Sequence, residues 1–380
     1  MLRTLAGQTA ETVVMFSVFV FAQSGLAQEI DPVNHLPNPY ETVRDWGSLP
    51  EGEVWGSVPG LQIDPDGYSL WVMDRCRTHS WQPGVHSCAG RDLPPIMKFD
   101  TRTGERVLAF GEDEFVFPHA IHVDFEGNVW IAESRNANEL EQQLFPESAN
   151  KGHKVVKFSP SGEILLTIGT PGVAGDPPER LNQPMDIAVA PNGDVFIAEG
   201  DHGGRDIGRI SKFSAEGNYL GSFGRIGTGP GEFRVPHGMT FDSDGLLYVA
   251  DRGNDRIQVF DQDGNYLQEF KQFGRPSDVA IDDNGFLYAI DSESGRRANR
   301  GWRKGIRIGR ASDGEVSYFI PPHFIEDTYI WPSGVTSYAE CAAGDAITVD
   351  AEGNIYAGEV GTGNPVIGIT QYLRRFELEP

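Results

Sequence analysis

Two histidines occupy the same place in two copies of a repeated pattern. His119 and His237 each follow a proline, in FPHAIHVDFEGNVW and VPHGMTFDSDGLLY, and each opens an alternating apolar run that turns at a glycine. A neutral imidazole is a common ligand of zinc and other divalent transition ions, but histidine also serves as a hydrogen-bonded core residue. The residues at the equivalent position of the other copies bear on this choice.

Six copies of the pattern align on the glycine of the turn. They span residues 58–74, 118–134, 184–200, 236–252, 276–292 and 344–360. Counting five residues back from the end of each first strand gives Pro59, His119, Met185, His237, Ser277 and Asp345. Ligand-type side chains therefore stand in the second, fourth and sixth copies.

Alternate repeats of a closed six-fold ring project side chains about 120° apart around the axis, as a three-ligand metal site with an open position requires. We predict that His119, His237 and Asp345 bind zinc or another divalent transition ion. The alternatives are structural histidines and, for Asp345, a hydrogen bond to a neighbouring strand. His122 is expected to face away from His119, because side chains alternate along a strand.

The ring itself is predicted from strand patterns. Each copy contains two strands joined by a tight Asp-Gly, Asn-Gly or Glu-Gly turn, and a second hairpin follows, as in IMKFDTRTGERVLAFG and VVKFSPSGEILLTIG. Four strands per unit, repeated six times, predict an all-β, six-bladed β-propeller. The last unit lacks a fourth strand after 370–378, and residues 43–47 resemble a fourth-strand ending. We therefore expect the N-terminal strand to close the last blade of one domain, 28–380.

The long connections are expected on the face of the ring that carries His119. They join the second and third strands, at 75–94, 135–151, 201–209 and 293–304, whereas the other turns are short. Sites usually lie on loops above a rigid scaffold. The stretch GWRKGIR at 301–307 is interpreted as a solvated strand start, with Trp302 as a residue that could shape a pocket.

Charge and the N-terminal segment limit the partners and the compartment. The formal net charge of -24 argues against binding to nucleic acid or to an anionic membrane. Residues 1–27 are typical of a secretory signal, with a membrane anchor as the alternative, so we expect a secreted or periplasmic protein. In an oxidising compartment Cys76 and Cys88 would pair, which leaves Cys341 as an inert or reactive thiol.

FPHAIHVDFEGNVW, LNQPMDIAVAPNGDVFIAEG and GEFRVPHGMTFDSDGLLYVADRGNDRIQVF resemble the NHL-repeat propellers, and specifically peptidyl-α-hydroxyglycine α-amidating lyase, over nearly all of the chain after residue 27. The resemblance implies a catalytic zinc on three axial histidines and a structural calcium nearby. His119 and His237 match two of these histidines, and Asp345 stands in place of the third. Arg75, in WVMDRC, matches an arginine that contacts substrate; a salt bridge to Asp74 or to another acidic residue of the loop is its alternative.

In this family a tyrosine is the proposed base. This chain has Glu199-Gly200-Asp201-His202 in its place, so Asp201 and His202 become candidates for proton transfer. The implied activity is a lyase reaction that splits an α-hydroxyglycine-type substrate, a small molecule or a peptide, into an amide and glyoxylate. Arg75 and Arg252 are expected to hold the carboxylate. The other hypotheses are a propeller hydrolase or lactonase with an axial calcium, and a non-enzymatic NHL binding scaffold.

Overall fold

The computed structural model describes residues 30–76, 85, 88–200, 205–295, 298–321, 344–360 and 368–379. The chain divides into two units, 1–31 and 32–380, and every helix and strand among the described residues lies in the second. The proposed signal, Asp201, His202 and Cys341 fall outside the described residues. Within the described residues, no helix is long and apolar enough to cross a membrane.

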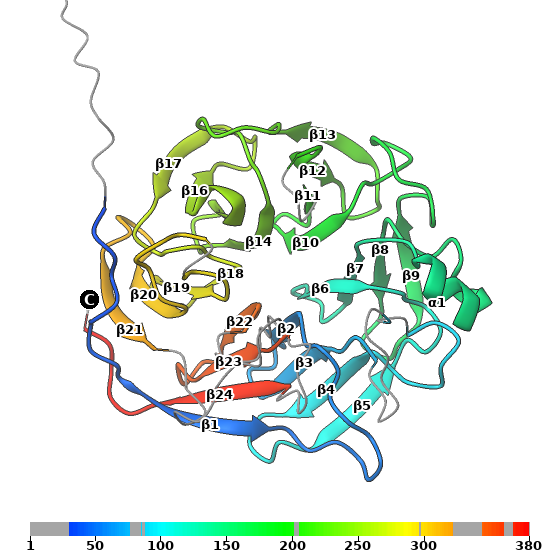
Figure 1. Ribbon diagram of the computed structural model, residues 1–380, viewed down its shortest axis with the longest axis horizontal. Coiled ribbons are helices and arrows are strands. Elements are labelled where there is room, and N and C mark those ends of the chain that lie inside the picture. Colours follow the sequence, from blue (N-terminus) through cyan, green and yellow to red (C-terminus); the bar gives the residue numbers. More distant parts are fainter. Residues whose placement is uncertain are drawn as a thin grey trace, which may run out of the picture. The chain divides into compact units, whose positions relative to one another are not determined.

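Six four-stranded antiparallel sheets surround a central axis, which confirms the six-bladed β-propeller (Figure 1). Blades 1 to 3 consist of β2 (Gly60–Ile63), β3 (Ser69–Met73), β4 (Ile96–Asp100) and β5 (Arg106–Phe110); β6 (Pro118–Val123), β7 (Val129–Glu133), β8 (Lys154–Phe158) and β9 (Ile164–Ile168); and β10 (Pro184–Val189), β11 (Val195–Gly200), β12 (Gly208–Phe213) and β13 (Tyr219–Phe223).

Blades 4 to 6 consist of β14 (Pro236–Phe241), β15 (Leu247–Asp251), β16 (Arg256–Phe260) and β17 (Tyr266–Phe270); β18 (Asp278–Ile281), β19 (Phe286–Asp291), β20 (Gly305–Arg310) and β21 (Val316–Ile320); and β22 (Ala346–Val349), β23 (Ile355–Gly358), β24 (Ile369–Arg374) and β1 (Tyr40–Trp46). The described helices are α1 (Glu139–Leu144), η1 (Pro146–Ser148) and η2 (Arg252–Asn254). In blade 6 the outermost strand comes from the start of the chain, as the sequence predicts.

The closing strand is anchored by pairing and by aromatic packing. β1 pairs with β24 from Tyr40 opposite Arg374 to Trp46 opposite Ile369. The Trp46 ring meets the Tyr356 ring edge-on, with 5.0 Å between the ring centroids. The first and last strands of the chain therefore share one sheet.

A repeated aromatic residue on the second strand of each blade builds the core between blades. The six are Trp71, Trp130, Phe196, Tyr248, Tyr288 and Tyr356, each at most 1% exposed. In five blades the indole N–H or phenol O–H donates to the aspartate that follows the first strand. Blade 3 has Ala190 in place of the aspartate and Phe196 in place of the Trp or Tyr, so no polar group is buried there without a partner.

The innermost strands belong to separate sheets, and side chains connect them. Each innermost strand makes a side-chain hydrogen bond with the backbone of the next blade, and we call these six contacts the inner-ring bonds. They are Gln62 to Val123 N, His122 to Val189 N, Asp186 to Met239 N, His237 to Ser277 O, Asp278 to Ile347 N and Thr348 to Ile63 N. The polar groups lining the axis therefore hold the blades in register.

Candidate metal centre

His119, His237 and Asp345 meet at the axis. One nitrogen or oxygen atom from each lies within 4.8 Å of the others, and all three residues are buried. The His119 and His237 rings are 4.8 Å apart between centroids, and His237 Nε2 lies 3.9 Å from Asp345 Oδ2. Two ligands about 2.0 Å from a tetrahedral ion would be about 3.3 Å apart. A small inward movement of the side chains would therefore bring three donor atoms around one ion.

The hydrogen bonds of the two imidazoles fit metal binding. His119 Nδ1 lies 2.8 Å from the carbonyl oxygen of Met185, and His237 Nδ1 lies 2.8 Å from that of Ser277. A carbonyl oxygen only accepts, so each Nδ1 carries the proton and each neutral ring keeps its lone pair on Nε2. Metal-binding histidines commonly donate their other ring N–H to a backbone carbonyl in this way.

Asp345 is both a candidate ligand and a hydrogen-bond acceptor. Its Oδ1 accepts from Ser292 Oγ at 3.3 Å and lies 3.4 Å from Arg252 Nη1. The hydrogen bond to a neighbouring strand that we considered as an alternative is thus present, at the end of β19. It involves Oδ1, whereas Oδ2 is the oxygen nearer to His237.

Two further carboxylates line the same cavity, and the sequence analysis missed them. Asp186 and Asp278 border the cavity together with the three candidate ligands. In the aligned repeats they directly follow the position of His119, in blades 3 and 5. Comparing that next position across the six copies would have identified them. Burial, with a smaller contribution from the charge of Asp345, raises the pKa of Asp278 to about 7. Burial and the neighbouring Asp278 raise the pKa of Asp186 well above its ordinary value.

Arg75 does not pair with Asp74, so that part of the alternative is wrong. The Asp74 carboxylate accepts from the backbone N–H groups of Gly56 and Cys76. Arg75 Nε instead donates to the carbonyl of Pro118 at 2.9 Å, and its guanidinium lies 3.9 Å from the centre of the Phe117 ring. This guanidinium lies within electrostatic range of Asp345.

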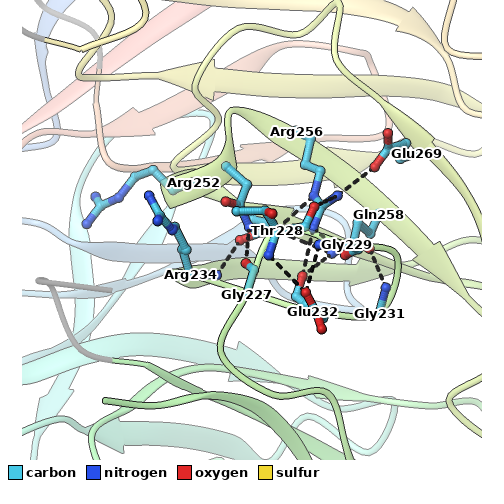
Figure 2. A network of polar contacts seen from close by, with 12 residues as sticks. Gly227, Thr228, Gly229, Gly231, Glu232, Arg234, Arg252, Arg256, Gln258 and Glu269 are labelled. Atoms are coloured by element: carbon cyan, nitrogen blue, oxygen red, sulfur yellow. Dashed lines mark hydrogen bonds and ion pairs between the residues drawn. The ribbon is translucent and has the colours of Figure 1, made fainter. Parts of the chain in front are cut away.

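Arg252 reaches the centre from the first residue of η2, and a polar network lies beside it (Figure 2). Arg256 forms an ion pair with buried Asp251 at 2.9 Å and donates to the carbonyl oxygens of Thr228, Gly229 and Glu232. Asp251 in turn accepts from Arg234 N, just before β14, the strand that carries His237. The network therefore fixes the two backbone segments that deliver Arg252 and His237.

Other predicted features have mixed outcomes. Cys76 and Cys88 form the expected disulfide. The interpretation of 301–307 as a solvated strand start is wrong for Arg307, which is fully buried and lies 3.3 Å from Asp291 in an ion pair. Trp302 packs against the Arg307 guanidinium and does not border the cavity as far as the described residues show. His122 accepts from Val189 N of β10, the strand whose Met185 carbonyl accepts from His119. The two side chains therefore do not point to opposite sides as expected, because a register shift between Pro118 and Ala120 interrupts the alternation.

A family model of the NHL repeat matches residues 233–260, which include His237. Human NHL repeat-containing protein 3 is 36% identical over 177 residues, 43% of this chain and 47% of the relative. Peptidyl-alpha-hydroxyglycine alpha-amidating lyase 2 of Drosophila melanogaster is 30% identical over 240 residues, 60% of this chain and 52% of the relative. This chain is a six-bladed β-propeller with one matched NHL repeat, and it is similar in sequence to amidating lyases.

The matched region spans about half the length of these two curated relatives. Among solved structures, a gluconolactonase from Xanthomonas campestris superposes on this chain with a TM-score of 0.54 and 16% identity, covering 88% of this chain and 89% of that one. Identity at that level supports the shared fold alone. The lyase names among the relatives and the axial cluster therefore carry the functional argument.

Proposed function

We propose that this chain is a metal-dependent lyase that cleaves the N–Cα bond of an α-hydroxyglycine-type substrate and yields an amide and glyoxylate. The observation that carries the proposal is the convergence of His119, His237 and Asp345 on the axis. The relatives named as amidating lyases support the reaction class. Zinc or another divalent transition ion suits two imidazoles and one carboxylate.

In this proposal His119, His237 and Asp345 hold the ion. When bound, such an ion lowers the pKa of a hydroxyl group and stabilises the alkoxide. Arg75 binds the substrate carboxylate through paired hydrogen bonds, with Arg252 as a second guanidinium near the ligands.

The reaction is a proton transfer from the substrate hydroxyl followed by cleavage of the N–Cα bond. A base removes the proton of the substrate hydroxyl, and Asp201 and His202 remain our candidates for it. The electrons of the O–H bond form the aldehyde C=O of glyoxylate. Those of the N–Cα bond leave with the amide nitrogen, which then takes up a proton.

The experiment joins metal analysis to a glyoxylate assay. Purified protein should contain close to one transition ion per chain and release glyoxylate from α-hydroxyhippurate. His237→Ala should lose both the ion and the activity, because one of three ligands is gone. His122→Gln is the matched control, since it removes a histidine that bonds to Val189 N and is not among the residues that line the cavity, and it should keep both. A His237→Ala protein with full metal content would refute the ligand assignment.

A calcium-dependent propeller hydrolase or lactonase is the second candidate. Asp186 and Asp278 make the cavity rich in carboxylate oxygens, which calcium prefers. Metal analysis separates the two candidates, because calcium without a transition ion would favour this class. The remaining candidate, a non-enzymatic scaffold, predicts that replacing both histidines leaves binding unchanged.

We propose that the protein acts outside the cytoplasm, secreted or in the periplasm. The Cys76–Cys88 disulfide supports this, since disulfides persist mainly in oxidising compartments. The substrate would be a small molecule or a peptide. The acidic net charge disfavours nucleic acid as a partner.

A further inference from the structure

The Phe117 ring carries two guanidinium groups beside the candidate metal centre. The Arg75 guanidinium carbon lies 3.9 Å from the ring centre, and that of Arg135 lies 4.3 Å from it. Phe117 is half-buried and precedes Pro118 and His119 in the chain. The ring thus connects Arg75 to the strand that supplies a candidate ligand.

Arg135 is held in place from its other side. It forms an ion pair with Glu141, a fully buried residue of α1, at 2.8 Å, and it also donates to the carbonyl of Asn136. A capping box between Asn138 and Glu141 begins the helix. The guanidinium of Arg135 is therefore a fixed neighbour of the Phe117 ring.

Arg75 is positioned without being neutralised. Within the part of the chain that the structure describes, no carboxylate oxygen lies within 4.0 Å of its guanidinium; its contacts are the Pro118 carbonyl and the Phe117 ring. Buried charges are ordinarily paired. An aromatic face and a carbonyl orient a cation but leave its full charge available. Burial and the nearby Arg135 lower the pKa of Arg75 to about 10, so it remains protonated at neutral pH.

We propose that Phe117 is a positioning residue that makes this site selective for substrates with a carboxylate. The Phe117 ring and the Pro118 carbonyl together fix the position of the Arg75 guanidinium, so that it meets a carboxylate in one orientation. The inference rests on the proposed function, in which Arg75 binds the substrate carboxylate. It goes further by assigning the selectivity to a residue that carries no charge.

The test removes the ring face and keeps the apolar volume. Phe117→Leu and Phe117→Met should each raise KM for α-hydroxyhippurate about 10-fold and change kcat less than about twofold, since only binding of the carboxylate is affected. KM for the neutral methyl ester of the same substrate should stay unchanged. Phe117→Tyr and Phe117→Trp keep a ring face and should restore the wild-type KM.

A matched control is Trp302→Leu, which removes another ring that packs on an arginine, away from the cavity. It should leave both KM values unchanged. Equal KM increases for acid and ester, or no increase, would overturn the inference. Failure of both the Leu and Met variants to fold would make Phe117 a core residue and would overturn it too.

Direct binding separates this inference from the proposed reaction. Hippurate and hippuramide differ only in the charged group, and neither is a substrate for the cleavage. Calorimetry should show that Phe117→Leu weakens hippurate binding about 10-fold and leaves hippuramide binding unchanged. If wild-type protein binds hippurate but releases no glyoxylate, the lyase proposal fails and the role of Phe117 stands. If wild-type protein does not prefer hippurate to hippuramide, the role of Phe117 fails.

Discussion

His122 shows how one side chain of an innermost strand can serve the fold alone. Its Nε2 accepts from Val189 N in the next blade, and burial lowers its pKa from 6.5 to about 4. The unfolded chain therefore binds a proton between about pH 6.5 and 4 that the folded chain does not. This group contributes stability above pH 6.5 that is lost as the pH falls toward 4.

We predict that His122→Gln flattens the acid limb of the stability curve. A glutamine oxygen can accept the same hydrogen bond but does not titrate. The free energy of unfolding, measured with urea from pH 7 to 4, should fall less in the variant, by at most about 3 kcal/mol. Parallel curves for variant and wild type would show that His122 is protonated equally in both states.

At the scale of single residues, the sequence predicted where side chains lie better than which residues they contact. Aligning the repeats assigns each residue to a blade and to a position along its strand. His119, His237 and Asp345 could therefore be placed together from the sequence. It gives no information on contacts between different loops. The stacking of Arg135 on Phe117 joins two connections of different length, and nothing in either segment predicts it.

At the scale of elements, a carboxylate at the end of the second strand of a blade accepts hydrogen bonds from the segment that enters the first strand. Five blades share this arrangement, through Asp74, Glu133, Glu199, Asp251 and Asp291. In blades 3 to 5 an arginine of the third strand pairs with the carboxylate. These hydrogen bonds fix the segments that lead into the first strands, including the segment before His237.

Arg256→Met should cost about 3–5 kcal/mol of unfolding free energy, because it leaves the buried carboxylate of Asp251 without its cation. Urea denaturation measures this. Arg225→Ala is the matched control: the Arg225 side chain is 80% exposed in its pair with Glu232, so its loss should cost about 1 kcal/mol or less. Similar costs for both variants would contradict the buried role of Arg256.

The same arrangement explains where element-level prediction failed. The hairpins were predicted because alternation and turn glycines are local signals, and all six turn glycines have φ between +74° and +89°. Arg307 was assigned to solvent because its stretch is rich in arginine. Its partner Asp291 lies on the adjacent strand, and a local pattern does not reveal that pairing.

At the scale of the whole molecule, β1 is the strand that closes the ring. It covers the edge of β24 and buries Tyr40 and Trp46, which are 3% and 9% exposed. Burial of each ring contributes on the order of 2 kcal/mol, and an uncovered strand edge invites association between chains.

We predict that a chain starting at Leu49 has a lower melting temperature than one starting at Ile30 and aggregates on heating. Calorimetry and light scattering check this. Equal melting temperatures would mean that blade 6 is stable with three strands.

The inner-ring bonds have a consequence for how this protein can evolve. His237 makes one of these bonds, and Asp345 accepts from Ser292 of the neighbouring blade, so exchanging either residue changes chemistry and stability at once. Substitutions in the outer connections leave the inner-ring bonds intact, because those segments lie outside the ring. Descendants that acquire a new substrate are therefore expected to retain the pore residues and to diversify the loops around its mouth.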